Sequence, residues 1–433
     1  MLSRTLDGDH RGRLAAVAAA CSGGGGSAGG PAGDAATGPN PVNTEAASVG
    51  KPVTDYLDYV GGKAGRADPD RSPIAIGWVN FEGGALEMPE ATQGAESAVR
   101  YVNAELGGID GHPLELHTCF IKQAEEEGQK CGQQLLNDRE VSVIAYGNVS
   151  IGAQSVETVV NGEKPIVIGV SASPSDATAK NTYILEGDQT HVFGPWGTFA
   201  RDVLHAKTAA VIYPSTTGST SAAAATKKGL ERAGVTVKSV GYDPNASDLL
   251  GPLTAAGGQT ADVIVPMTDA IGCVNLYKAM RQIGSTKPTV SAPLCLSPQV
   301  SQGLGDLPVG WTFGIAQTLP TDTKAPDAAA YLSTATKHGL PKENAQVVFA
   351  ALGWASVLTV AKLMNEVGAE EISPDTMTER LKAFKGPLVM GPPSVQCGKY
   401  PDAPAVCNDQ TRFYKYLGKG RFQALTGWLR PPE

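Results

Sequence analysis

The sequence predicts an α/β protein with two doubly wound, Rossmann-like lobes in tandem. Short apolar runs, typical of strands that are covered on both faces, alternate with segments of helical periodicity. The alternation begins near Pro73 and begins again near Val192, and loops rich in glycine and serine follow several of the runs. Because a strand, a crossover helix and a parallel strand form a right-handed unit, each series predicts one open parallel sheet.

The first strand–helix–strand unit, residues 73–119, contains the expected binding edge. Residues 74–79 are an apolar run, and residues 80–85 are a glycine-bearing loop after it. A helix is expected from Pro89, because the missing N–H of proline would be unpaired in a first helical turn anyway. Ligands of open α/β sheets bind beyond the carboxyl ends of the strands. The loop at 80–85 is therefore expected at a binding cleft.

The remaining elements of the first lobe follow the same pattern. Strands are expected over residues 112–119, 141–146, 164–169 and 182–186, and helices over residues 54–60, 125–137 and 152–160. The loops at 147–152 and 170–175 should then converge with the loop at 80–85 on one rim. Their backbone N–H groups and serine hydroxyls can hold a polar ligand, although a single serine more often forms a cap or a turn.

The second series and a helical tail complete the predicted chain. Strands are expected over residues 208–213, 235–240, 261–266, 288–293 and 311–315, and helices over residues 193–204, 221–233, 249–256, 272–284, 326–338, 344–367 and 374–384. Ser373 is the expected N-cap of the last helix. Residues 347–364 come nearest to a membrane span, but Ser356 and Lys362 interrupt the run, so a buried helix is expected.

Composition narrows the classes of function. The 433 residues correspond to two or three domains, at roughly 150 residues each. Apolar residues make up 42% and charged residues 18% of the chain, which allows a sizeable core and excludes wholesale disorder. The net charge of −8 is spread along the chain without a basic stripe, so nucleic acid is not an expected partner.

Six of the seven cysteines fall into three neighbouring pairs. The pairs are Cys119 with Cys131, Cys273 with Cys295, and Cys397 with Cys407. Three such disulfides would place the protein in an oxidising compartment, although six cysteines allow fifteen pairings and buried free thiols are the alternative. No metal site is expected, because there is no Cys-x-x-Cys and the six histidines are scattered.

The start of the chain resembles a bacterial lipoprotein signal. Arg11 and Arg13 precede a short stretch of small apolar residues that ends directly before Cys21. Residues 1–21 are predicted to be a signal in which Cys21 is lipidated and becomes the mature N-terminus. A disordered Ala/Gly tail is the alternative. Residues 22–72, rich in glycine, alanine and proline as far as about residue 50, are predicted to be a flexible tether.

From about residue 73 to residue 430 the chain resembles the type I periplasmic binding proteins, specifically their branched-chain amino-acid-binding branch. The segments that carry the resemblance are 74–77, 94–103, 107–111, 170–174 and 277–284. The resemblance implies two lobes joined by a three-stranded hinge, with the ligand cleft between them. The crossings would fall near residues 187–190, 317–321 and 386–393. Lobe 1 would comprise residues 73–188 and 321–388, and lobe 2 residues 189–320 and 389–433, including the loop between Cys397 and Cys407.

The resemblance also implies the ligand-binding residues. They are Phe81, Glu82, Ser150, Ser171, Ala172, Ser173, Gly218, Thr268, Asp269 and Leu294. Small hydroxyl residues of lobe 1 would hold a ligand carboxylate. Gly218 and Leu294 stand where the family has an aromatic and an acidic residue, so Asp269 or Glu82 would have to pair with a ligand ammonium group. Phe81 is the expected loop aromatic.

The function implied by the resemblance is capture of a small polar solute, an amino acid or a related amide or carboxylate, by closure of the lobes. The protein would be a monomeric extracytoplasmic lipoprotein, anchored to the cell membrane through Cys21, that serves an ABC permease. Catalytic residues and cofactors are not expected, because no predicted strand leads into Gly-x-Gly-x-x-Gly or Gly-x-Ser-x-Gly and there is no His-Glu-x-x-His. A ligand-sensing receptor domain with a separate partner is the alternative, and an α/β enzyme is a less favoured one.

Overall fold

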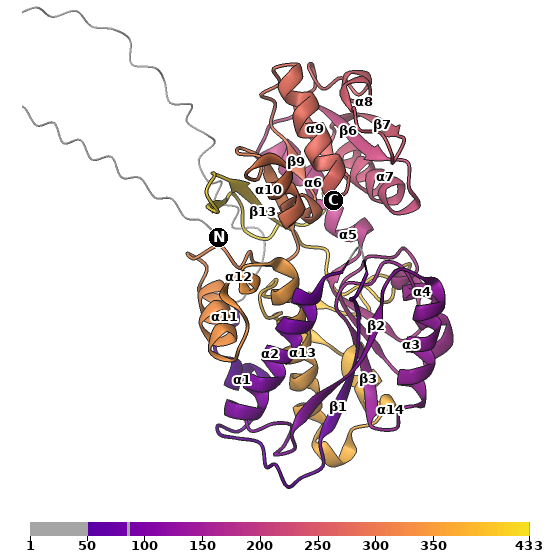
Figure 1. The fold of residues 1–433 in the computed structure, drawn as a ribbon, viewed down its shortest axis with the longest axis vertical. Helices are drawn as coiled ribbons and strands as arrows, with labels where there is room; N and C mark the ends of the chain where they lie inside the picture. The colour runs from indigo at the N-terminus through magenta and orange to yellow at the C-terminus, as the bar shows by residue number, and fades with distance from the viewer. Residues whose placement is uncertain (1–50, 85–86, 433) are drawn as a thin grey trace, which may run out of the picture. The chain divides into compact units, whose positions relative to one another are not determined.

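The computed structural model describes residues 51–84 and 87–432, which form two α/β lobes (Figure 1). The predicted signal at residues 1–21, the lipidation residue Cys21 and the tether as far as residue 50 lie outside the described residues. The short helix expected before lobe 1 is α1 (Tyr56–Val60). Its side chains Tyr56 and Tyr59 are buried in the core of lobe 1, so the predicted tether ends before this helix.

Lobe 1 is built on a parallel sheet of five strands. In spatial order these are β2 (Leu114–Ile121), β1 (Ile74–Phe81), β3 (Val141–Tyr146), β4 (Ile166–Val170) and β5 (Thr182–Gly187). Because every pairing in this sheet is parallel, the loops that follow β1, β3 and β4 lie at one edge, as the sequence predicts.

Helices cover both faces of this sheet. Alternate residues of β1 face opposite sides: Ile76 and Trp78 pack with α2 and α13, whereas Ala75 and Val79 pack with α3 and α4. One side carries α1, α2 (Pro89–Glu105), α11 (Pro326–Lys337), α12 (Lys342–Ala345), α13 (Val348–Val367) and α14 (Pro374–Lys382), and the other carries α3 (Glu125–Asn137) and α4 (Ala153–Val160). Both faces are therefore buried, which explains the continuous apolar runs in the strands.

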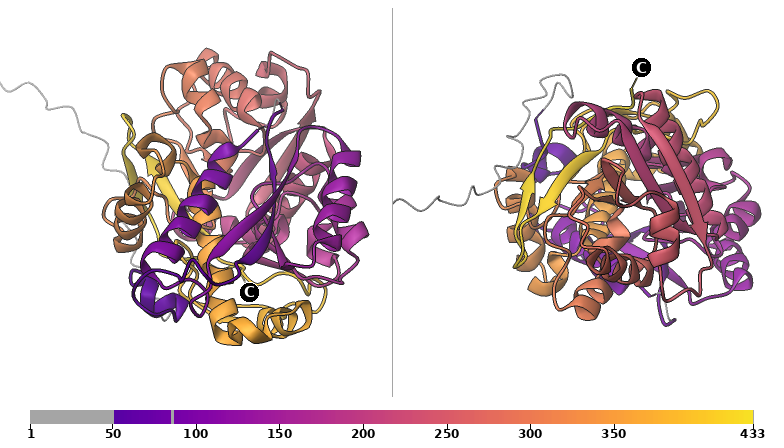
Figure 2. Two further views of the ribbon diagram at one scale, coloured as in Figure 1. Left: turned by 60° about the horizontal axis from the view of Figure 1, so that its bottom comes forward. Right: turned by 90° about the horizontal axis from the view of Figure 1, so that it is seen from above.

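Lobe 2 has a mixed sheet. Strands β7 (Thr236–Tyr242), β6 (Thr208–Pro214) and β8 (Val263–Pro266) pair in parallel, and a bridge from Ile264 to Thr289 joins them to β9 (Val290–Ser291). The sheet continues through β10 (Thr312–Ile315), β13 (Arg412–Tyr416) and β14 (Phe422–Ala424). The antiparallel β13–β14 hairpin, in yellow, forms the edge (Figure 2). Helices cover both faces of the lobe 2 sheet. One face carries α5 (Gln189–Phe193), α6 (Pro195–Asp202) and α7 (Thr217–Arg232), and the other carries α8 (Leu250–Ala255), α9 (Ala270–Gln282) and α10 (Pro298–Leu304).

Three segments connect the lobes, and the structure corrects the place of one. The chain leaves β5 at residues 187–189 and returns after β10 near residues 316–322, as predicted. The third crossing lies at residues 408–411 and not at 386–393. Residues 395–407 belong to lobe 1, because the Ile184 N–H donates to Ala405 O (2.7 Å) and the Cys407 N–H donates to Ile184 O (3.0 Å). These bonds use backbone groups at the free edge of β5.

The three predicted disulfides are present. Cys119–Cys131 joins β2 to α3, Cys273–Cys295 joins α9 to the 3₁₀ turn η2 (Pro293–Leu296), and Cys397–Cys407 closes the loop that lies against β5. The neighbour pairing is therefore confirmed. Disulfides of this kind typically contribute about 2–4 kcal/mol to the free energy of unfolding, mainly by constraining the unfolded chain.

Two predicted helices are each divided. Residues 193–204 were expected as one helix, but they fall in α5 and α6, because Pro195 cannot donate the hydrogen bond that would continue α5. Residues 344–367 are divided at Val347, whose backbone is extended with ψ 133°. The remaining described elements are η1 (Asp176–Thr178), η3 (Ala369–Glu371) and the short ribbon of β11 (Lys385–Gly386) and β12 (Val395–Gln396).

Reciprocal glycines bring α2 and α13 together, and the two helices lie side by side in Figures 1 and 2. A Cβ on Gly94 would lie 2.0 Å from Ala350 O, and one on Gly353 would lie 2.0 Å from Ala91 O. Helix α13 is also the one described helix that is long and apolar enough to cross a membrane, yet 78% of its most apolar window is buried inside the protein. The prediction of a buried core helix is confirmed.

We predict that Gly94→Ala lowers the free energy of unfolding by about 1–3 kcal/mol, because the added methyl group has to push two helix backbones apart. Gly251→Ala in α8 is the matched control, since a Cβ there meets no atom within 4 Å. The control substitution should be neutral or stabilise the protein by up to about 1 kcal/mol. Urea unfolding measures both. Equal effects of the two substitutions would contradict the proposed backbone contact.

Candidate ligand-binding site

A pocket of about 620 Å³ lies at the carboxyl ends of strands from both lobes. Its walls are segments that follow β1, β8, β9 and β10, together with the start of α13 and part of the β13–β14 hairpin. In open α/β sheets the ligand site lies at this end of the strands. The volume also falls in the range of small-molecule sites, about 300–1,000 Å³. This pocket is therefore the candidate site.

Asp269 and Leu294, both predicted site residues, line the lobe 2 wall of this pocket. Asp269 is the N-cap of α9, and its Oδ1 accepts a hydrogen bond from the Gly272 N–H at 2.8 Å. Leu294 lies on η2, and 43% of its surface is exposed. The Cys273–Cys295 disulfide joins α9 to η2 and so fixes the two parts of the wall to each other.

The other two predicted residues of lobe 2 do not line this pocket. Thr268 is buried, and its hydroxyl is hydrogen-bonded to the Tyr242 hydroxyl at 2.6 Å, so it supports the loop before α9. Gly218, expected in a loop, lies in the first turn of α7, because the Thr216 hydroxyl caps this helix by accepting from the Ser219 N–H at 3.3 Å. A Cβ on Gly218 would meet no atom within 4 Å, so the space beside it is open.

The lobe 1 wall contains Glu87, Met88 and Glu90, which the sequence analysis missed. The buried amide of Asn80 positions this wall: its Nδ2 donates to Met88 O at 2.9 Å, and its Oδ1 accepts from the Asn148 N–H at 3.0 Å. Asn80 thereby ties the start of α2 to the loop after β3. The signal that could have revealed this role is a polar residue at the end of an otherwise apolar strand.

The serine-rich loop after β4 is held by the buried Asp176. Ser171 Oγ donates to Ser173 O at 2.9 Å, and the Ser173 N–H donates to Asp176 Oδ2 at 3.2 Å. Burial, together with the proximity of the two carboxyl groups, raises the pKa of Glu157, and burial also raises the pKa of Asp176. The pair therefore retains a proton at neutral pH, and the shape of the loop depends on its hydrogen bond to Asp176.

None of the predicted lobe 1 residues lines the pocket as the described residues define it. Phe81 is the last residue of β1 and is 2% exposed, so its predicted place in the loop is wrong: the strand runs two residues further and turns the ring into the core. Glu82 accepts a hydrogen bond from Asn80 at 3.2 Å. Ser150 is exposed after β3, and Ala172 is half-buried between the two loop serines. Contact of Glu82 and of the residues after β3 and β4 with a ligand stays a prediction.

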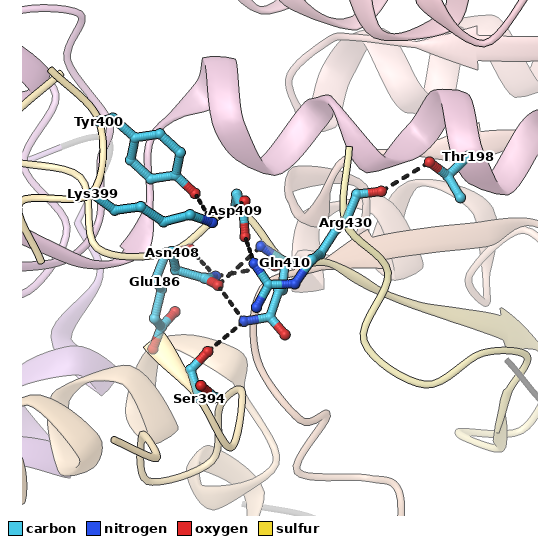
Figure 3. A network of polar contacts seen from close by, with 9 residues as sticks. All are labelled: Glu186, Thr198, Ser394, Lys399, Tyr400, Asn408, Asp409, Gln410 and Arg430. Carbon is cyan, nitrogen blue, oxygen red and sulfur yellow. Dashed lines mark hydrogen bonds and ion pairs between the residues drawn. The ribbon is translucent and has the colours of Figure 1, made fainter. Parts of the chain in front are cut away.

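Buried hydrogen bonds connect the three crossings. Glu186, at the end of β5, accepts a hydrogen bond from Gln317 Nε2 at 2.8 Å. Its backbone carbonyl accepts from Asn408 Nδ2 at 3.0 Å, and Figure 3 shows this second contact. Burial raises the pKa of Glu186 to about 8, although the bond from Gln317 opposes the shift. The carboxyl group is therefore largely uncharged at neutral pH, which removes the cost of burying a charge.

Asp409 is the charged counterpart in the same network (Figure 3). Its carboxylate lies 2.9 Å from Lys399 Nζ of the disulfide loop and 3.0 Å from Arg430 Nη1 of the C-terminal segment. Burial alone would raise the pKa of Asp409, but hydrogen bonds from Tyr400 and Lys399 and the charge of Arg430 hold this pKa below its usual value. Asp409 thus joins side chains of both lobes through its charge.

A second pocket, of about 630 Å³, lies on the hinge and hairpin. Asp322, Arg412 and Trp428 are among its lining residues, but it includes none of the loops after β1, β3, β4, β6 or β8. Apart from the segment after β10, it therefore lacks the strand ends that line the candidate site.

Within residues 51–84 and 87–432, one cluster, of Glu115, His117 and Glu140, has the residue types of a metal site. Both ring nitrogens of His117 are already hydrogen-bonded, Nδ1 to Asp138 at 2.6 Å and Nε2 to Glu115 at 2.9 Å. Burial lowers the pKa of His117, but the bonds to Asp138 and Glu115 outweigh burial and raise it overall. A protonated imidazole has no lone pair for a metal, so the arrangement favours an ion pair.

Two doubly wound lobes with a pocket at their strand ends define the class of the protein. The chain belongs to the periplasmic binding protein family, since residues 73–400 match the family model of that description. The match includes most of both lobes and ends before the β13–β14 hairpin, and the predicted type I membership is confirmed. No curated protein sequence matches the chain significantly.

Solved structures share the fold at low sequence identity. A leucine-binding protein, LivK, from Thermotoga maritima has a TM-score of 0.65 at 14% identity, over 83% of this chain and 99% of its own. LivJ from Streptococcus pneumoniae, solved with isoleucine, has a TM-score of 0.65 at 17% identity, over 83% of this chain and 100% of its own. A solute-binding protein of an ABC transporter from R. palustris, solved with 4-hydroxybenzoate, has a TM-score of 0.67 at 16% identity, over 84% of this chain and 98% of its own. These likenesses establish the type I two-lobed fold.

We predict that Glu186 makes stability fall as pH rises. Glu186 has a folded-state pKa of about 8 and an ordinary unfolded-state pKa. Such a group stabilises the folded protein fully at any pH below its unfolded-state pKa. This stabilisation is lost as the pH rises through the folded-state pKa. Wild-type stability should therefore decline between about pH 4.5 and 8 relative to Glu186→Gln, by up to roughly 1.4 kcal/mol per pH unit. Urea unfolding of both proteins across this range measures the difference. Parallel pH curves would contradict a buried, protonated Glu186.

Proposed function

We propose that this protein is the extracytoplasmic solute-binding component of an ABC importer and that it captures a small solute by closing its two lobes. The observation that carries the proposal is the pocket of about 620 Å³ with walls from both lobes. A solute that touches both walls favours the closed arrangement by its higher affinity for that arrangement. Turnover of the solute is not part of this function.

Family membership and the disulfides support the proposal. Proteins of the same fold are described as binding leucine, isoleucine or 4-hydroxybenzoate, and two of the three are described as parts of transporters. The three disulfides fit an oxidising, extracytoplasmic compartment. Lipidated Cys21 would be the membrane anchor, residues 22–50 the tether, and a membrane permease the partner that receives the closed, monomeric form.

The first prediction of this proposal concerns ligand-dependent stability. Thermal unfolding of the full chain against amino acids, short amides, aromatic acids, amines and polyols should reveal one stabilising chemical class. A solute at a hundredfold excess over its Kd stabilises the native state by about 2.7 kcal/mol. The effect should be reduced by Leu294→Ala, which removes apolar surface from the lobe 2 wall of the pocket.

Val309→Ala is the matched control. Val309 is an exposed apolar residue of lobe 2, 60% accessible, and it lies outside the pocket lining. The proposal requires the control protein to respond to the solute like the wild type. A solute that stabilises wild type, control and Leu294→Ala equally would place binding elsewhere. A flat response to the whole panel would count against capture of a small solute.

A further inference from the structure

We propose that this pocket selects a cationic solute with an apolar body, such as an alkyl or aryl amine, over amino acids and carboxylates. The inference rests on the proposed function and names its substrate class. It follows from the charges, the apolar side chains and the helix ends that surround the pocket.

Four carboxylates line the pocket, and no lysine, arginine or histidine is among its described lining residues. The acids are Glu87, Glu90, Asp269 and Asp306. Two belong to lobe 1 and two to lobe 2, so a cation between the lobes would be attracted from both sides. Charges attract more strongly near a protein surface than in bulk water, and a ligand carboxylate would be repelled for the same reason.

The four carboxylates are not neutralised by the protein. None of them forms a salt bridge with another described residue. Their hydrogen bonds come from uncharged donors of the protein. Asp306 accepts from the Tyr416 hydroxyl and from the Leu307 and Lys419 backbone N–H groups. Glu87 accepts from the Gly83 N–H, and Asp269 accepts one bond through Oδ1 alone. Glu90 accepts none from the described residues. A ligand cation would therefore meet acceptor oxygens that no protein cation occupies.

The rest of the lining is apolar and partly open to solvent. Five large apolar side chains are exposed in the described chain, and two of them, Ile271 at 71% and Leu294 at 43%, lie in this pocket. Met88, Leu319 and Phe349 extend the apolar surface from the lobe 1 and hinge sides. Removing this apolar surface from water would stabilise a complex with a solute that has an apolar body. A fully hydrophilic cation such as a polyamine would leave this surface wet.

Helix N-termini at the pocket are the opposing feature, because each carries about half a positive charge. The N-termini of α2 and α9 are already countered, by Glu90 in the first turn of α2 and by Asp269 as the cap of α9. The start of α13 has no side-chain cap, and neither has the start of the short helix α10, whose N-cap Ser297 also lines the pocket. Two uncompensated half charges are still small beside four carboxylates, so the sum favours a cation. The free N–H groups at the start of α13 suit a neutral acceptor atom on the solute.

A matched set of ligands tests this inference directly. The full chain is titrated by calorimetry with 4-methylbenzylamine, 4-methylbenzyl alcohol and 4-methylbenzoate, which share one ring and differ in head-group charge. Isoleucine and 4-hydroxybenzoate serve as reference ligands. We expect the amine to bind at least tenfold more tightly than the alcohol and the alcohol more tightly than the benzoate. Of the three ligands, the amine alone should bind more weakly when salt is added, because salt screens its attraction to the carboxylates.

Asp269→Asn isolates the charge, because asparagine also caps helices well and preserves the fold of α9. This variant should weaken the amine about tenfold and leave the alcohol unchanged. Asp243→Asn is the control, since Asp243 likewise accepts a backbone N–H, from Asn245 at 2.9 Å, and lies outside the pocket. This control substitution also removes one negative charge, and it should leave the affinity for the amine unchanged. Leu294→Ala should weaken the amine and the alcohol alike.

The outcomes separate this inference from the proposed function. Tighter binding of isoleucine or a benzoate than of the amine, lost in Leu294→Ala, would overturn the cation preference and leave solute capture standing. Equal weakening by Asp243→Asn and Asp269→Asn would also overturn it, because the effect would then be that of net charge. No binding of any of the five ligands would count against both proposals.

Discussion

Parallel strand pairing is the constraint on which the rest of the structure depends. Parallel neighbours cannot be joined by a tight turn, so each connection crosses a face of the sheet, usually as a helix. This covers both faces and makes the strands continuously apolar. It also brings every loop that follows a strand to the same edge. The candidate pocket lies where both lobes present that edge, and its acids and apolar side chains come mainly from the starts of the crossover helices.

The connection between the lobes combines a neutral carboxyl group with a charged one. Glu186 is buried where the first and second crossings meet, and its carboxyl group, largely protonated at neutral pH, accepts a hydrogen bond from Gln317. Asp409 keeps its charge because two cations and a tyrosine surround it. A neutral hydrogen bond in the dry interior and an ion pair that reaches both lobes give the crossings defined positions without an unpaired buried charge. Closure of the lobes would have to preserve both contacts or exchange them.

The sequence was sufficient for the architecture, because strand alternation, helix caps and glycine stops are local signals. The bounds of α3, β3 and the start of α14 agree with the periodicity, and all three disulfides follow from neighbouring cysteines. The site was harder to predict, because it depends on contacts between distant segments. Asp269 and Leu294 were found through the resemblance, whereas Glu87, Glu90 and Asp306 gave no local signal. Phe81 was misplaced because a one-sequence pattern does not show that β1 runs past its apolar centre. The disulfide loop was assigned to the wrong lobe because nothing local marks its pairing with β5.

The central claim is that a solute in the pocket draws the two lobes together. Small-angle X-ray scattering of the full chain, with and without saturating concentrations of the tightest-binding ligand, tests this claim most directly. The account predicts a decrease in the radius of gyration on binding, and a smaller decrease for Leu294→Ala at the same ligand concentration. An unchanged radius of gyration for a wild-type protein that calorimetry shows to be saturated would contradict closure, and would leave a binding protein whose lobes do not move.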